Sequence, residues 1–191
     1  MQTILGIDCS SSTIGWAYLG VEDNTIRLLE HGHIKPPGKD GYSLIKRLDI
    51  VMVEIAALCD RLKPDNSIVE EIIQHMEGRT SANTIIVLAA FNKAVSVQIL
   101  RSTGKEPAFL LPISIRTRIK RFLQRTEKID KEEIPTILQN YFGKSFFKVV
   151  GYKQRGKNKG QPIVETYDEA DAVAAAWAGV IELGLVKGTH E

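Results

Sequence analysis

The chain has 191 residues, of which 43% are hydrophobic and 25% charged, and its formal net charge is +2 at pH 7. This balance excludes a disordered or fibrous chain and predicts one domain over residues 1–191. The sequence has neither the pattern of a signal peptide nor an apolar run of membrane-spanning length, and its two cysteines lack a metal-binding spacing. We therefore expect a cytoplasmic protein that does not contact a membrane.

The first apolar run covers residues 4–7 and ends in a carboxylate, Asp8, before a Ser-rich turn. The run is too short for a helix and predicts a buried strand. An ionised Asp beside Ile and Leu is costly to bury unless a cation or strong hydrogen-bond donors lie next to it. Asp8 is therefore either a cap for the turn or a group that faces a metal ion or a phosphate.

Apolar periodicity and turn residues define the other elements in chain order. They predict strands at 4–8, 13–20, 25–34, 67–73 and 107–113, and helices at 44–62, 81–100, 114–123, 131–141 and 166–183. This order predicts an α/β fold in which a mixed five-stranded sheet is flanked by helices and the first and fourth strands are neighbours. The helix over 81–100 is apolar on most faces, which favours a homodimer contact.

Carboxylates stand at the ends of several predicted elements. Glu70 lies at the end of the fourth strand, and Asp168 and Asp171 lie three residues apart on one face of the last helix. The predicted order brings them to Asp8, and such a cluster cannot stay fully ionised without divalent cations. The alternatives are a simple capping role for the helix pair and, in place of Glu70, its neighbour Glu71 on the opposite face of the strand.

Positive charge is concentrated in the second half of the chain. Residues 101–160 carry a net charge of +10 and the remainder carries −8. This distribution indicates a polyanion-binding surface beside an acidic centre, although a charge run is more often a solvated face. The Gly- and Lys-rich segment 144–161 is typical of a flexible basic loop or a hairpin tip.

The strand ending in Asp8, the strand ending in Glu70 and the Asp168-Glu-Ala-Asp171 helix together resemble the RuvC-type Holliday junction resolvases of the ribonuclease H-like superfamily. The resemblance covers nearly the whole chain. It implies a ribonuclease H-like fold and a dimeric endonuclease that cuts four-way DNA junctions, leaving 5′-phosphate and 3′-hydroxyl ends. It also implies two Mg²⁺ ions, replaceable by Mn²⁺, held by these four acids. The brevity and divergence of the chain suit a bacteriophage protein.

Basic residues in this reading hold DNA phosphates around the acidic centre. They are Arg79, Arg116, Arg118, Lys120, Arg121, Lys128, Lys131, Lys153, Arg155, Lys157 and Lys159. Two other functions stay open on the sequence alone. The first is an actin-like or sugar-kinase-like ATPase fragment, suggested by the Ser-rich turn after Asp8. The second is a DNA-binding module without catalytic activity.

Overall fold

The structure, a computed structural model, describes residues 1–72, 81–143, 147–155, 159–160, 162–165 and 167–187. Its strands are β1 (Gln2–Cys9), β2 (Ile14–Glu22), β3 (Thr25–Ile34), β4 (Asn66–Glu70), β5 (Ala108–Leu110), β6 (Val149–Tyr152) and β7 (Pro162–Val164). Its helices are α1 (Leu44–Leu62), α2 (Ala82–Thr103), α3 (Pro112–Phe122), the short 3-10 helix η1 (Lys131–Glu133), α4 (Ile134–Phe142) and α5 (Tyr167–Glu182).

Five strands form one mixed sheet in the order β3-β2-β1-β4-β5. The first three strands make an antiparallel meander, and β4 and β5 run parallel to β1. This arrangement confirms the predicted mixed sheet, with the first and fourth strands side by side.

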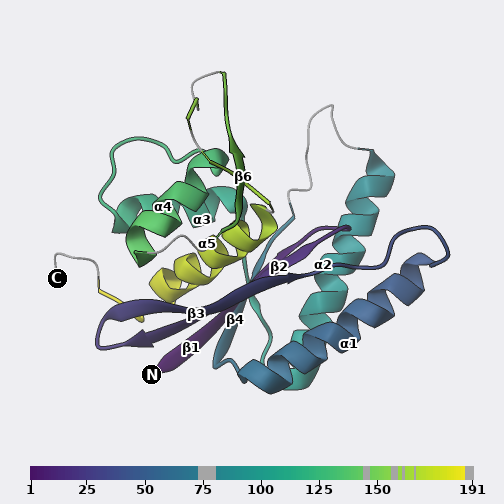
Figure 1. The fold of residues 1–191 in the computed structure, drawn as a ribbon. Coiled ribbons are helices and arrows are strands. Elements are labelled where there is room, and N and C mark those ends of the chain that lie inside the picture. The colour runs from purple at the N-terminus through teal and green to yellow at the C-terminus, as the bar shows by residue number, and fades with distance from the viewer. Residues whose placement is uncertain (73–80, 144–146, 156–158, 161, 166, 188–191) are drawn as a thin grey trace.

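Helices cover both faces of the sheet (Figure 1). On one face α1 and α2 pack over Leu5 and Ile7 of β1, with Phe91 of α2 fully buried. On the other face α5 packs over Ile4 of β1, joined by α3 and α4 around Trp177. Consecutive side chains of a strand point to opposite faces, so residues 4–7 of β1 are apolar because they must fill both cores.

The structure corrects three predicted boundaries. The fourth strand ends at Glu70 instead of residue 73, and the fifth ends at Leu110 because α3 already begins at Pro112. Proline is favoured in the first turn of a helix, where its missing N–H costs nothing. The basic segment 144–161 contains β6, which pairs with β7 as a separate two-stranded sheet.

Helix α2 departs from the expectation that no segment is long and apolar enough to cross a membrane. Its 22 residues are long and apolar enough for a membrane span by length and composition, with a mean hydropathy of 1.4 over their most apolar stretch. Among the described helices α2 is the one of which this is true. Core helices pass the same test. In this structure Phe91, Val95 and Ile99 of α2 are fully buried against α1 and the sheet, so one side of the helix belongs to the core.

Helix α5 lies unusually close to the sheet because glycines face it. A Cβ atom placed on Gly15 of β2 would lie 2.0 Å from the backbone oxygen of Asp168, and one on Gly6 of β1 would lie 2.3 Å from the backbone oxygen of Ala172. Both contacts are with backbone, which cannot rotate away. The absence of side chains at Gly6 and Gly15 therefore sets the height of α5 above the sheet.

Replacing Gly15 by alanine should push the first turn of α5 away from β2. We expect the free energy of unfolding to fall by roughly 1–3 kcal/mol or more, the usual cost of overpacking. Urea unfolding followed by circular dichroism measures this. Gly38→Ala is the matched control, because nothing lies within 4 Å of its added Cβ, and it should change stability by less than about 0.5 kcal/mol. Equal stability of both variants would contradict the proposed close approach.

Candidate active site

Asp8 and Glu70 stand at the carboxyl ends of neighbouring parallel strands. Ile7 of β1 lies opposite Val69 of β4, so the next residue on each strand is the carboxylate. Adjacent strands in a sheet are about 4.8 Å apart. The register therefore places both acids at one edge of the sheet.

Asp168 and Asp171, in the first turns of α5, face the same edge. Asp171 is only 6% exposed. Burial, followed by repulsion from Glu70, raises the pKa of Asp8 well above its usual value. The carboxylates of Asp171 and Asp168 raise it further. The structure thus brings the four predicted acids together in one buried centre.

The acidic centre lacks positive charge. Burial raises the pKa of Glu70 to about 8, and repulsion from Asp171 is the next cause. Burial also raises the pKa of Asp171, although Lys131 and Arg116 oppose the shift. A carboxylate with a raised pKa is held where its ionised form is unfavourable.

Lys131 of η1 supplies part of the missing charge. Its Nζ lies 2.6 Å from Oδ2 of Asp171. Burial acts to lower the pKa of Lys131, but the Asp171 carboxylate outweighs burial and the pKa is raised. Asp8 and Glu70 contribute in the same direction. Lys131 is therefore protonated, and its ammonium group lies next to the carboxylate cluster.

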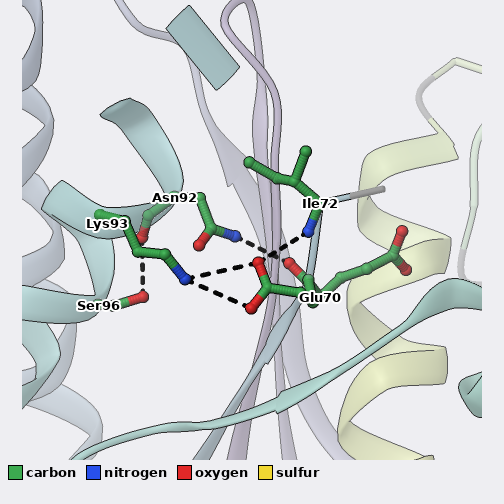
Figure 2. Close-up of polar contacts among 6 residues, drawn as sticks. Glu70, Ile72, Asn92, Lys93 and Ser96 are labelled. Carbon is green, nitrogen blue, oxygen red and sulfur yellow. Dashed lines mark hydrogen bonds and ion pairs between the residues drawn. The ribbon is translucent and has the colours of Figure 1, made fainter. Parts of the chain in front are cut away.

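Glu71 turns away from this centre. Its carboxylate lies 3.4 Å from Nζ of Lys93 on α2, and its Oε1 accepts a hydrogen bond from the backbone N–H of Ile72 at 3.0 Å. Figure 2 shows the Glu70 side chain directed toward α5, on the side opposite Lys93. The ammonium of Lys93 also lies 3.9 Å from the ring centre of Phe109. Of the two acids that the sequence left open, the structure places Glu70 in the cluster.

Asn92 fixes the backbone that carries Glu70. This fully buried side chain of α2 donates from Nδ2 to the backbone oxygen of Glu70 at 2.8 Å (Figure 2). The hydroxyl of Ser96 donates in turn to the backbone oxygen of Asn92 at 2.7 Å. Sequence reasoning missed this contact, although an amide on the buried face of an apolar helix was the available signal.

Two histidines of β3 hold the first turn of α5. Nδ1 of His31 lies 2.7 Å from one carboxylate oxygen of Glu169, and Nδ1 of His33 lies 2.5 Å from the other. The hydrogen bond with His31 lowers the pKa of Glu169, burial opposes this, and the bond with His33 lowers it further. Glu169 lies between Asp168 and Asp171 in the chain, so the contact orients both. The spacing of two residues between the histidines was a signal that sequence reasoning did not use.

The sequence is similar to those of curated RuvC proteins, although no family model matches it. It is 31% identical over 101 residues to the crossover junction endodeoxyribonuclease RuvC of Rubrobacter xylanophilus, an alignment that covers 50% of this chain and 55% of that protein. It is 26% identical over 178 residues to RuvC of Ehrlichia ruminantium (strain Welgevonden), which covers 92% of this chain and 94% of the relative. The chain thus matches about half the length of the first relative and nearly all of the second.

Solved structures of such proteins superpose on the whole chain. RuvC of Thermus thermophilus in complex with a Holliday junction substrate has a TM-score of 0.69 at 17% identity, covering 97% of this chain and 99% of that one. The yeast mitochondrial Holliday junction resolvase Ydc2 has a TM-score of 0.59 at 11% identity, covering 95% and 81%. The chain is thus similar in sequence to RuvC proteins and shares their fold. Its sheet and flanking helices have the ribonuclease H-like fold that the sequence motifs implied.

The acidic centre offers the donors that hard divalent cations prefer. Mg²⁺ and Mn²⁺ bind carboxylate oxygens. The raised pKa values of Glu70 and Asp171 mean that their ionised forms are unfavourable here and that a nearby cation would stabilise them. Among the described residues no three acidic, histidine or cysteine side chains are arranged to hold one ion. The acids thus match such cations in the chemistry of their oxygen donors but are not arranged around one, and the ammonium of Lys131 lies 2.6 Å from Oδ2 of Asp171.

Three of the basic residues predicted to contact DNA lie together beside α3. Arg116, Lys120 and Lys128 line a hollow of about 220 Å³. Arg116 also lowers the pKa of Glu70 and Asp171, so the hollow adjoins the acidic centre. These positions agree with a phosphate-binding role.

The other predicted DNA contacts are more scattered over the protein. Arg118 pairs with Glu182 at 2.5 Å and lies, with Arg121, beside a second hollow of about 330 Å³. Lys153 lies 3.7 Å from Glu132. Lys131 faces the acidic centre, whereas Arg155 and Lys159 are exposed near the end of β6 and the start of β7. Arg79 and Lys157 lie outside the described residues.

Without divalent cations the protein should lose stability as the pH rises. The folded pKa of Glu70 is about 8 against a usual 4.5, so the folded state keeps a proton that the unfolded state has lost. The resulting stability is complete below about pH 4.5 and is lost as the pH passes 8, by at most about 1.4 kcal/mol per pH unit for one group. Urea unfolding in a chelator across this range measures the slope.

In the same experiment, Glu70→Gln should be more stable than the wild type at pH 8 and should show a flatter pH dependence. Glu71→Gln is the control, because its carboxylate faces Lys93 outside the cluster. It should keep the wild-type slope. Identical slopes for the wild type and Glu70→Gln would contradict the raised pKa.

Proposed function

We propose that this chain is a structure-selective endonuclease that resolves four-way DNA junctions by metal-assisted hydrolysis of phosphodiesters. The observation that carries the proposal is the convergence of four carboxylates from β1, β4 and α5 in one centre, where the pKa values of Asp8, Glu70 and Asp171 are raised. Sequence similarity supports the same reading, since the similar proteins are named as crossover junction endodeoxyribonucleases. A DNA-binding role alone does not explain buried acids, which would repel the phosphates.

The four acids have distinct positions for this work. Asp8 and Glu70, on adjacent strands, would hold one side of a pair of Mg²⁺ ions, and Asp168 and Asp171 the other. Bound cations of this kind supply Lewis-acid activation of a water molecule and of the leaving 3′ oxygen, which gives 5′-phosphate and 3′-hydroxyl ends. Mn²⁺ has the same preference for oxygen ligands and should substitute.

The basic residues around the centre bind and orient the DNA. Arg116, Lys120 and Lys128 line one hollow next to the acids, where they would hold phosphates of the strand to be cut. Lys131 pairs with Asp171 at 2.6 Å, and a divalent cation held by the acids would leave its ammonium available for a phosphate. These contacts position the backbone and carry no sequence information.

The second half of the proposal is a homodimer through α2, which would present two acidic centres to the two strands of a junction. Ile86, Val97 and Leu100 lie on one stripe of the helix and are 62%, 42% and 43% exposed. This stripe is opposite the buried residues of the helix, so it is the apolar surface that remains to be covered. The Thermus relative was solved with a Holliday junction substrate, a partner with two-fold related strands.

Asp8→Asn and Asp171→Asn should each abolish cleavage of a synthetic four-way junction in Mg²⁺ while leaving junction binding within about threefold of the wild type. Each change removes a ligand charge without altering side-chain volume. Glu71→Gln is the matched control and should cut normally, because Glu71 pairs with Lys93 outside the centre. Cleavage at the wild-type rate by Asp8→Asn would refute the metal-assisted mechanism. Binding by the wild type without any cleavage would favour a non-catalytic module.

The double variant Ile86→Asp/Val97→Asp should be monomeric, since two buried charges in an apolar contact outweigh its remaining area. Size-exclusion chromatography with light scattering measures the mass against the 21.2 kDa of one chain. Leu183→Asp, which changes an apolar residue of similar exposure beyond α5, should leave the mass of the assembly unchanged. A wild-type protein that runs as a monomer at all concentrations would rule out this interface.

A further inference from the structure

The β6–β7 hairpin is a separate structural unit beside the acidic centre. Its two strands pair only with each other, with Gly151 opposite Ile163 and Tyr152 opposite Pro162, and do not join the five-stranded sheet. In Figure 1 β6 extends away from α4 and α5 beyond the body of the molecule. We call the described residues of this unit, 147–155, 159–160 and 162–165, the β-ribbon.

The inner face of the β-ribbon is anchored next to the acids. Lys153 lies 3.7 Å from Glu132 of η1. Lys153 and Ile163 line, with Lys131 and Tyr167, a hollow of about 310 Å³. Because Lys131 is also the ion-pair partner of Asp171, a DNA strand that reaches the acidic centre must pass close to the base of the β-ribbon.

The β-ribbon carries two uncovered apolar side chains in β6. They are Val150 and Tyr152, and Val150 is the extra residue where the register of the hairpin shifts between Val149 and Gly151. They are 57% and 58% exposed. Arg155 and Lys159 are also exposed, whereas the exposed Lys148 lies 3.3 Å from a carboxylate oxygen of Glu165. Exposed apolar side chains together with exposed cationic ones match a polyanion that also presents apolar surface.

We propose that the β-ribbon enters a groove of one duplex arm of the DNA, with Tyr152 and Val150 against base edges and Arg155 and Lys159 on the flanking phosphates. This inference rests on the proposed nuclease function and adds the element that contacts bases. The major groove admits a two-stranded ribbon, and base edges there include the apolar methyl group of thymine. Lys153, which sequence reasoning assigned to phosphates, serves instead to fix the ribbon through Glu132.

The test separates apolar contacts with bases from ionic contacts with phosphates by their response to salt. Binding of the wild type, Tyr152→Ala, Tyr152→Phe and Arg155→Ala is measured on a four-way junction and on a linear duplex of the same arm sequence, without divalent cations and over a series of salt concentrations. Tyr42→Ala is the matched control, because Tyr42 is an exposed aromatic residue in the segment between β3 and α1. Thermal unfolding of each variant checks the fold.

We expect Tyr152→Ala to weaken binding to both DNAs by about 5- to 10-fold, the loss of one good base contact, with no change in the slope of log affinity against log salt. Arg155→Ala should flatten that slope by about 0.9, the value for one phosphate contact. Tyr152→Phe and Tyr42→Ala should bind as the wild type does. Loss of affinity on the junction alone would overturn the groove assignment in favour of contact with an unpaired base.

Wild-type affinity of Tyr152→Ala for both DNAs would overturn the inference outright, and so would a flatter salt slope for that variant. Neither result bears on the nuclease proposal, which depends on cleavage by the wild type and its loss in Asp8→Asn. Conversely, a wild type that binds the junction and does not cut it would refute the nuclease proposal, and the β-ribbon would still be tested by binding.

Discussion

The close seat of α5 on the sheet is the constraint on which the rest of this structure depends. Gly6 and Gly15 leave no side chain between the strands and the helix, and the backbone of Asp168 lies where a Cβ of Gly15 would be. This contact brings acids from positions 8 and 168 together although they belong to opposite ends of the chain. Glu169 then holds the helix turn against His31 and His33, so packing and hydrogen bonding fix the same few residues.

The acidic centre lowers the stability of the fold because it holds several carboxylates close together. Burying several carboxylates together is unfavourable, and the structure offsets this with the ammonium of Lys131 and the more distant guanidinium of Arg116. Such a centre remains short of positive charge, which is the property that makes divalent cations bind. Carboxylates that ionise together without mutual repulsion would gain less electrostatic stabilisation from a bound metal ion.

Sequence patterns identified the strands and helices whose apolar residues recur at a regular spacing. The strand before Asp8 and the helix from Leu44 to Leu62 were both found, because alternation and helical spacing record which side of an element is buried. The start of α3 at Pro112 was missed, since the apolar run continues past it and only the proline marks the change. The choice of Glu70 over Glu71 depends on Lys93, a residue of another element, and no local pattern could show it.

Asn92 gives α2 a consequence beyond packing. One side of this helix holds the backbone of Glu70, and the opposite side carries the stripe of Ile86 and Val97 that we propose as the dimer contact. A rigid helix cannot shift on one side without shifting on the other. In a dimer joined through α2, the position of each Glu70 would then depend on the contact of α2 with the second subunit. Cleavage would then depend on dimer formation, so that a single subunit would not cut one strand of a branched DNA alone.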